Sequence, residues 1–276
     1  WSQSYPYNQF CPVDPVTGLR SKVGCNAVAV GQILHYWGCK VFPDGAKTYT
    51  PLRFNNSLTV NFCGRVYNWD AMSHTTGDTV NAKLLYHCGV AIGANYGSDG
   101  TSATISQSQN AIKTYFGFST NGVKWKDDYT YSSWISLLKA DIDAGRPIYY
   151  NAQDSLTSAG HAWVVDGYRA ANEFHCNWGW GSSYNSWCLL SALNLSSNYF
   201  RDNQGAIIGA QPVLDACSGL SGSDIVCSSN TSYSVTIPST ASVTWSKSGN
   251  LTQVGGNTGT TYTVYATSAS GGAGSI

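Results

Sequence analysis

A cysteine, Cys25, lies between Gly24 and a long apolar stretch at residues 26–37. Apolar side chains recur there at three- and four-residue steps, which predicts a helix that begins at the cysteine and ends near Gly38. A helix N-terminus stabilises a thiolate because its unpaired N–H groups and its dipole favour negative charge. The glycine lets a substrate backbone come close, and the Cys25 N–H can face a developing oxyanion. Cys25 is therefore a candidate nucleophile, and a structural or disulfide-bonded cysteine at a helix start is the alternative.

A nucleophilic thiol needs a base, and His161 is the best candidate among the five histidines. It directly follows Gly160 and begins an apolar, strand-like stretch, so its ring could face a cleft. Asn177 could orient this base, because the chain order is then Cys, His, Asn and aromatic residues follow the asparagine. A residue count through the turn at residues 170–172 leaves His161 and Asn177 out of direct register. A packed, purely structural histidine is the alternative interpretation.

The elements that must position these residues change in kind along the chain. Helical periodicity predicts helices at residues 26–37, 78–93, 106–117 and 132–145. Short β-type stretches follow at residues 146–153, 160–169 and 173–180. Helices followed by antiparallel strands predict an α+β fold with segregated halves.

The composition changes after about residue 213, where Ser, Thr, Gly and Val dominate and short stretches alternate between polar and apolar. Alternation with a period of two predicts β-strands. About 60 residues are fewer than the roughly 100 of a complete immunoglobulin-like sandwich. We therefore expect a main domain at residues 1–213 and a partial β module at residues 214–276, for which a Ser/Thr-rich linker is the alternative.

Composition excludes several classes of partner. Charged residues make up 11% of the chain and the formal net charge is zero, so neither nucleic acid nor an anionic membrane surface is expected to bind. No apolar stretch approaches the ~20 residues that span a bilayer. No signal peptide precedes Trp1, and we expect a mature or trimmed form.

The nine cysteines indicate a compartment but no metal site. None forms a Cys-x-x-Cys pair, which argues against a zinc ribbon or a redox motif, and we expect neither a metal nor another cofactor. Many cysteines with few charges favour an oxidising, extracellular setting. The odd count permits up to four disulfides and one remaining thiol, with the connectivity open.

The ordered set of motifs resembles the streptopain family of secreted bacterial cysteine peptidases, which have a papain-like fold. The matching segments cover nearly all of residues 1–213 and include Trp-Ser-Gln at the start, Val-Gly-Cys-Asn-Ala around Cys25, Gly-His-Ala around His161, and Asn-Trp-Gly-Trp-Gly from Asn177. The separation of 136 residues between Cys25 and His161 lies within the roughly 130–150 typical of papain-like peptidases. The sequence departs from papain itself, since Cys25 lacks the Cys-Gly-Ser-Cys-Trp signature, and it has more cysteines than the family pattern.

The resemblance implies a role for each matching residue around the thiol. It makes Cys25 the nucleophile, His161 the general base and Asn177 the residue that orients His161. Trp178 shields or supports this pair, and the Gln3 side chain completes the oxyanion hole.

Three further positions match the walls of the substrate cleft. Ser102 and Gly160 line the cleft where the substrate backbone lies, and Trp180 forms part of the same wall.

The function implied is that of a secreted endopeptidase acting through an acyl-enzyme on protein or peptide substrates, with a bulky apolar side chain preferred two residues before the cut. An inhibitory pro-segment is expected, with cleavage just before Trp1, and the tail resembles immunoglobulin-like modules that follow such domains. One alternative is a cell-wall amidase or transpeptidase with the same Cys–His pair. Another is a non-catalytic glycan-binding or adhesion module, which would not need Cys25, His161 and Gln3 together.

Overall fold

The structure is a computed structural model, and it describes residues 1–195, 197–213, 220–221, 231–235, 251–256 and 258–266. The chain separates into two compact units, Trp1–Val213 and Leu214–Ile276. Every candidate site residue lies in the first unit. The second unit is described by itself below.

The predicted helices are all present in the first unit, and each begins or ends at a residue suited to that position. They are α1 (Cys25–Trp37), α2 (Thr79–Ile92), α3 (Ile105–Tyr115) and α4 (Tyr131–Asp143). The Asp78 side chain caps α2, and Thr104 forms a capping box with Gln107 at the start of α3. Short 3-10 turns lie at Gly38–Lys40, Trp69–Ala71, Lys126–Asp128 and Ala170–Asn172.

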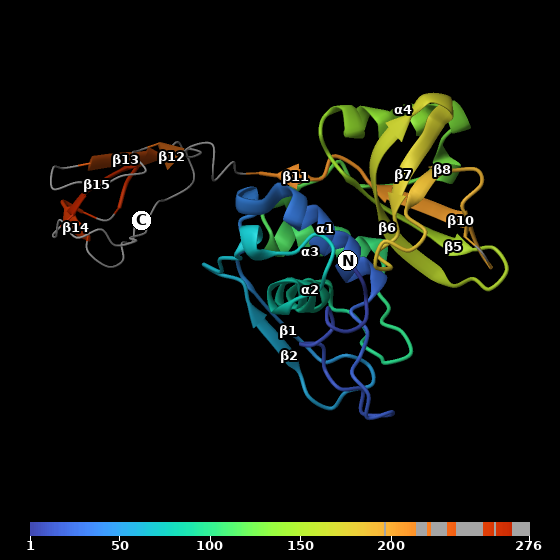
Figure 1. Cartoon of the computed structure of the whole chain (residues 1–276), viewed down its shortest axis with the longest axis horizontal. Helices are drawn as coiled ribbons and strands as arrows, with labels where there is room; N and C mark the ends of the chain where they lie inside the picture. The colour runs from blue at the N-terminus through green and yellow to red at the C-terminus, as the bar shows by residue number, and fades with distance from the viewer. Residues whose placement is uncertain (196, 214–219, 222–230, 236–250, 257, 267–276) are drawn as a thin grey trace. The chain divides into compact units, whose positions relative to one another are not determined.

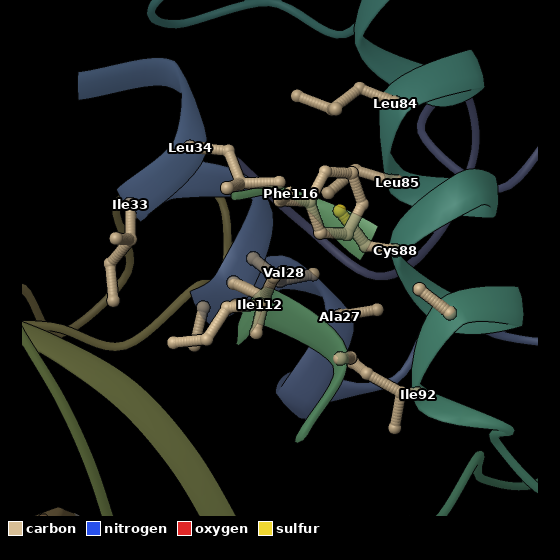
Figure 2. Close-up of a cluster of buried hydrophobic side chains, with 14 of the residues drawn as sticks. Ala27, Val28, Ile33, Leu34, Leu84, Leu85, Cys88, Ile92, Ile112 and Phe116 are labelled. Atoms are coloured by element: carbon tan, nitrogen blue, oxygen red, sulfur yellow. The ribbon is translucent and has the colours of Figure 1, made fainter. Parts of the chain in front are cut away.

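Helix α1 is the central element of the first unit (Figure 1). Its side chains from Asn26 to Val30 are all buried, as are Ile33 and Leu34, so little of the helix faces solvent. In Figure 2, Ala27, Val28 and Leu34 of this helix lie in one cluster with Leu85 and Cys88 of α2 and with Ile112 and Phe116. Burial on this scale fixes the position of the first residue of α1, which is Cys25.

A larger antiparallel sheet forms the other half of the unit. Its strand order is β4-β10-β5-β6-β7-β8, with β9 paired to β10. The strands are β4 (Val123–Trp125), β5 (Ile148–Asp154), β6 (Gly160–Arg169), β7 (Glu173–Asn177), β8 (Ser186–Leu189), β9 (Asn194–Leu195) and β10 (Asn198–Ile207). Strands β5, β6 and β7 confirm the predicted β-type stretches. Strand β10 was not predicted, because register shifts near Asp202 interrupt its pairing with β5 and its polar residues hide the alternation.

Side chains on the two faces of this sheet pack into two different hydrophobic cores. Tyr149, Ala162 and Val164 belong to the helical core, whereas Tyr150 and Trp163 belong to a second core that includes Trp134 and Leu138 of α4. Neighbouring residues in a strand point to opposite faces, which is why Tyr149 and Tyr150 separate in this way. The α+β prediction is confirmed.

Smaller sheets complete the described residues. Strands β1 (Ala46–Tyr49) and β2 (Leu58–Asn61) form a hairpin, and β3 (Phe118–Ser119) pairs with β11 (Gln211–Pro212). In the second unit, β12 (Leu220–Ser221), β13 (Thr231–Val235), β14 (Leu251–Val254) and β15 (Thr261–Ala266) form one antiparallel sheet in the order β12-β13-β15-β14. The immunoglobulin-like character of this unit stays a prediction. Within the described part of the chain, no helix has the length and apolarity needed to cross a membrane.

The cysteines that the structure describes carry free thiols, at Cys11, Cys25, Cys63, Cys88, Cys176 and Cys188. The Cys39 side chain, Cys217 and Cys227 lie outside the described residues. The six described cysteines form no disulfide with one another. The expectation of an oxidising compartment therefore stays a prediction.

Candidate active site

The Cys25 thiol lies at the first residue of α1 and is half-buried. Gly24 precedes it with φ +89° and ψ 138°, a backbone conformation that residues with side chains rarely adopt. The backbone N–H groups of Ala162, Asn26 and Cys25 itself face the sulfur closely enough to lower its pKa. Burial raises the pKa of the thiol, and these donors counteract that rise. The thiol is thus poised at a cluster of N–H groups that would stabilise its charged form.

His161 is a buried residue near the start of β6. Its Nε2 lies 2.9 Å from the main-chain oxygen of Trp178. Because a carbonyl oxygen only accepts, Nε2 must carry the hydrogen in this bond, which leaves the lone pair of the neutral ring on Nδ1. Burial lowers the pKa of His161 to about 4, although the Trp178 carbonyl acts in the opposite direction. At neutral pH the ring is therefore a neutral base with a free acceptor at Nδ1.

Strand β6 brings this base to the thiol. Helix α1 packs against β6, and the backbone N–H of Ala162, the residue directly after His161, lowers the pKa of the Cys25 thiol. The first turn of α1 therefore meets β6 at the histidine. No hydrogen bond between Cys25 and His161 occurs among the described residues, so the two groups are neighbours that are not directly bonded.

Asn177 does not make the contact that we expected of it. It lies opposite Val164 in the β6–β7 pairing, and its Oδ1 accepts the N–H of Gly179 at 3.3 Å. Val164 is the third residue after His161 along β6, and no hydrogen bond joins Asn177 to His161 among the described residues. The Trp178 carbonyl holds the His161 ring in place of the Asn177 amide. Sequence offered no signal for this group, because every residue has a main-chain carbonyl.

Aromatic rings surround the histidine on several sides. The ring centroid of Trp180 lies 4.4 Å from that of His161, Phe200 lies at 5.4 Å, and Trp163 and Trp178 lie at 6.0 and 6.1 Å. Trp178 and Trp163 are fully buried, whereas Trp180 is half-buried. This packing fixes the ring and lowers the local dielectric, which is the cause of its depressed pKa.

The first residues of the chain are held between two loops of the site. The Gln3 carbonyl accepts the N–H of Val23, and the Trp1 carbonyl accepts the N–H of Gly181 at 2.8 Å. The Trp1 side chain is buried, and its indole N–H donates to the Ser73 carbonyl. The main chain of Gln3 is thus bonded to Val23, which lies two residues before Cys25. The side-chain amide of Gln3 has no hydrogen bond among the residues described.

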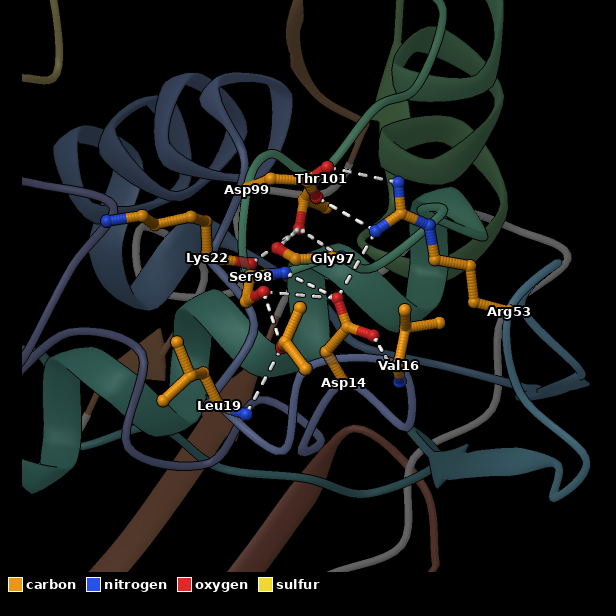
Figure 3. Close-up of polar contacts among 10 residues, drawn as sticks. Asp14, Val16, Leu19, Lys22, Arg53, Gly97, Ser98, Asp99 and Thr101 are labelled. Atoms are coloured by element: carbon orange, nitrogen blue, oxygen red, sulfur yellow. Dashed lines mark hydrogen bonds and ion pairs between the residues drawn. The ribbon is translucent and has the colours of Figure 1, made fainter.

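A loop at residues 97–102 borders the thiol on the helical side. Its anchor is the buried carboxylate of Asp14, which accepts from the N–H and hydroxyl of Ser98, from the Val16 N–H and from Arg53 (Figure 3). Thr101 of this loop packs so closely on Gly24 that an added Cβ there would lie 2.9 Å from its methyl carbon. Sequence analysis missed Asp14 and Arg53, because their partners are distant in the chain.

Ser102 and Gly160 both lie at the surface near the thiol. Ser102 is exposed and pairs through its backbone with Asn95, and it helps to line a shallow pocket of about 280 Å³ with Arg53 and residues 99–101. A Cβ at Gly160 would meet nothing within 4 Å, so open space lies beside it. Both positions are compatible with a cleft wall, and their contact with substrate stays a prediction.

A thiol at a helix start, a histidine on the adjoining strand and helical and sheet halves define a cysteine peptidase architecture of the papain-like kind. The solved structure of active interpain A, a cysteine protease of Prevotella intermedia, has a TM-score of 0.67 and 26% identity, covering 75% of this chain and 90% of that one. A prointerpain A fragment from the same organism has a TM-score of 0.64 and 26% identity, covering 76% of this chain and 69% of that one. Residues 1–188 match the Peptidase C10 family, and the chain belongs to that family.

Two characterised relatives agree with this assignment. Streptopain of Streptococcus pyogenes is 29% identical over 245 residues, which cover 77% of this chain and 60% of the relative. The thiol protease/hemagglutinin PrtT of Porphyromonas gingivalis is 27% identical over 248 residues, covering 80% of this chain and 27% of the relative. This chain therefore spans about 60% of the length of the streptopain relatives. The predicted fold and the resemblance to the streptopain family are confirmed.

Proposed function

We propose that this chain is a cysteine endopeptidase that hydrolyses peptide bonds of proteins and peptides. The observation that carries the proposal is the packing of α1, which begins at Cys25, against β6, which carries His161 at its second position. Membership of the Peptidase C10 family supports the same activity. No metal or cofactor takes part in the proposed reaction.

The reaction begins from a neutral thiol and a neutral imidazole, since burial favours the uncharged form of both groups. As the sulfur attacks the peptide carbonyl carbon, the thiol proton passes to Nδ1 of His161. The oxyanion of the tetrahedral intermediate receives the Cys25 N–H and the Gln3 side-chain amide.

Collapse of this intermediate breaks the C–N bond, and the leaving amine takes the proton from Nδ1. The acyl group now forms a thioester with Cys25. Water attacks the thioester while Nδ1 accepts its proton, which releases the carboxylic acid product and restores the thiol.

The residues around His161 position it for both proton transfers. The Trp178 carbonyl keeps hydrogen on Nε2 and so keeps the lone pair on Nδ1. Trp178 and Trp180 pack beside the ring and exclude water, and Asn177 supports the loop through Gly179. Asn177 thus positions His161 indirectly, through the loop that carries Trp178.

Substrate and maturation follow from the streptopain resemblance. The cleft bordered by Ser102, Gly160 and Trp180 takes the substrate backbone, with a bulky apolar side chain two residues before the cut. The protein is secreted by a bacterium and is made with an inhibitory pro-segment. The solved prointerpain A fragment supports a pro-form in this family.

Casein digestion under mild reductant tests the proposal. Cys25→Ala should retain less than about one per cent of wild-type proteolysis, because removing a nucleophile leaves only residual catalysis. Cys63→Ala is the matched control, since it removes an exposed free thiol. Full proteolysis by Cys25→Ala, or release of peptidoglycan fragments without casein cleavage, would contradict the proposal.

The oxyanion role of Gln3 has its own test. Gln3→Ala should lower turnover about 10²–10³-fold, the usual cost of one lost oxyanion donor. Alkylation of Cys25 by iodoacetamide forms no oxyanion on a carbonyl, so its rate should stay near that of the wild type. His161→Ala should slow both reactions near neutral pH. Wild-type turnover by Gln3→Ala would remove Gln3 from the mechanism.

A further inference from the structure

A buried polar cluster lies directly behind the candidate nucleophile, and no step above uses it. It consists of Asn26, Ser108 and Tyr149, from α1, α3 and β5. Asn26 is 8% exposed, and Ser108 and Tyr149 are inaccessible to solvent. We propose that Asn26, locked by Tyr149 and Ser108, donates a side-chain N–H to the Cys25 sulfur and so stabilises the thiolate. The inference rests on the proposed role of Cys25 as the nucleophile.

The contact between the amide and the sulfur is direct. Asn26 Nδ2 lies 3.8 Å from Cys25 Sγ, a long hydrogen bond to a large acceptor atom. The same nitrogen lies 3.2 Å from the Ala103 carbonyl. An amide nitrogen has two hydrogens, so one can serve each acceptor.

The orientation of this amide is fixed by its partners. The Ala103 carbonyl only accepts, so the NH₂ group must face it, and a flipped amide would place two oxygens together. On the other side, the Tyr149 hydroxyl donates a hydrogen bond to Asn26 Oδ1. Ser108 Oγ lies 3.4 Å from Oδ1 and 3.3 Å from the Tyr149 oxygen, and it supports the pair. The donor that faces the sulfur is therefore held before any charge develops there.

Burial makes this arrangement effective. Burial is the main cause of the raised pKa of Tyr149, and a negative charge on Cys25 raises it further. In a medium of low polarity a fixed donor stabilises a nearby negative charge more than it would in water.

The pH dependence of Cys25 alkylation tests this inference in the full chain. The rate of carbamidomethylation at Cys25 is followed by mass spectrometry, with iodoacetamide, between pH 5 and pH 10. Asn26→Leu should shift the profile to higher pH and leave the high-pH plateau unchanged, because it removes a donor without removing the thiol. At pH values below the midpoint of the profile, we expect Asn26→Leu to be alkylated about three- to tenfold more slowly than the wild type. A rise of one unit in the pKa of Cys25 lowers the fraction of thiolate about tenfold in that range.

Two tyrosine variants provide a matched comparison that preserves packing. Tyr149→Phe removes the hydroxyl that bonds Asn26 Oδ1, and it should also shift the profile to higher pH. The alkylation rate below the midpoint should fall about two- to threefold. Tyr150→Phe also removes a buried hydroxyl, but that hydroxyl bonds Gln204 and Trp134, so no shift is expected. Thermal unfolding of each variant identifies any protein that does not fold, and Tyr149→Phe then carries the test.

An unshifted profile in folded Asn26→Leu, or equal shifts in the two tyrosine variants, would overturn the inference. The alkylation readout does not require proteolysis. Failure of the proposed function would instead appear as proteolysis by Cys25→Ala, so the two failures are distinguishable.

Discussion

Replacing Gly24 by alanine perturbs the site at its most constrained backbone position. At φ +89° and ψ 138° a side chain is strained, and the new Cβ would lie 2.9 Å from Thr101 Cγ2 and 3.1 Å from the Thr101 carbonyl oxygen. The loop that carries Thr101 has little freedom to retreat, because Asp14 and Ser98 anchor it. The chain around Cys25 must therefore move.

The cost has two parts. A residue with a side chain in a sparsely populated backbone region costs about 1–3 kcal/mol, and overpacking costs about 1–3 kcal/mol more. We expect a loss of about 2–6 kcal/mol in unfolding free energy. For a unit of about 200 residues this corresponds to a fall of about 4–24 °C in Tm. Turnover should fall about 10²-fold or more, since a displacement of about 1 Å at a reacting group has that effect.

Calorimetry and casein digestion measure the two effects. Gly18→Ala is the control, because Gly18 also has a positive φ, +71°, but an added Cβ there meets nothing within 4 Å. It should cost only about 1–2 kcal/mol and leave turnover unchanged. Adding Thr101→Ser to Gly24→Ala removes the methyl contact and should restore part of the Tm. A Gly24→Ala protein with wild-type Tm and turnover would refute the reasoning.

Three further predictions concern other parts of the chain. Burial lowers the pKa of His87 to about 3 beside Tyr67, so the unfolded state binds a proton that the folded state excludes. The unfolding free energy should thus fall by about 3–5 kcal/mol between pH 6.5 and pH 3, and urea unfolding of His87→Gln should show a flatter pH dependence; an identical slope would contradict this. Asn177→Ala should lower turnover less than His161→Ala, since the Trp178 carbonyl still orients the ring; equal losses in casein digestion would argue for a direct role. A chain that ends after Val213 should keep its activity on small peptides, and loss of activity in a folded protein would place part of the tail in the site.

The parts of the fold that sequence analysis predicted are those with local causes. The periodicity of α1 to α4 and the β-type stretches of β5 to β7 follow from neighbouring side chains and their caps. Cys25 and His161 were found because a reactive side chain beside a glycine is visible in one short segment.

The parts that were missed depend on long-range contacts. Asp14 bonds Ser98 and Arg53, and Asn26 meets Tyr149, yet none of these pairs is close in the chain. The His161 partner was missed for another reason, because a main-chain carbonyl has no residue type to recognise.

A base oriented by a main-chain carbonyl has a distinctive genetic consequence. No substitution of Trp178 deletes that acceptor, so its orienting function is insensitive to mutation of the residue that carries it. The vulnerable positions are those that set the path of the loop: Asn185, whose Oδ1 accepts the Trp178 N–H, and Gly179, where a Cβ would lie 2.8 Å from Val28. Alleles that disturb this hydrogen bond should therefore concentrate at Gly179 and Asn185, and in insertions or deletions between them, whereas substitutions of Trp178 act through the packing of its ring on His161.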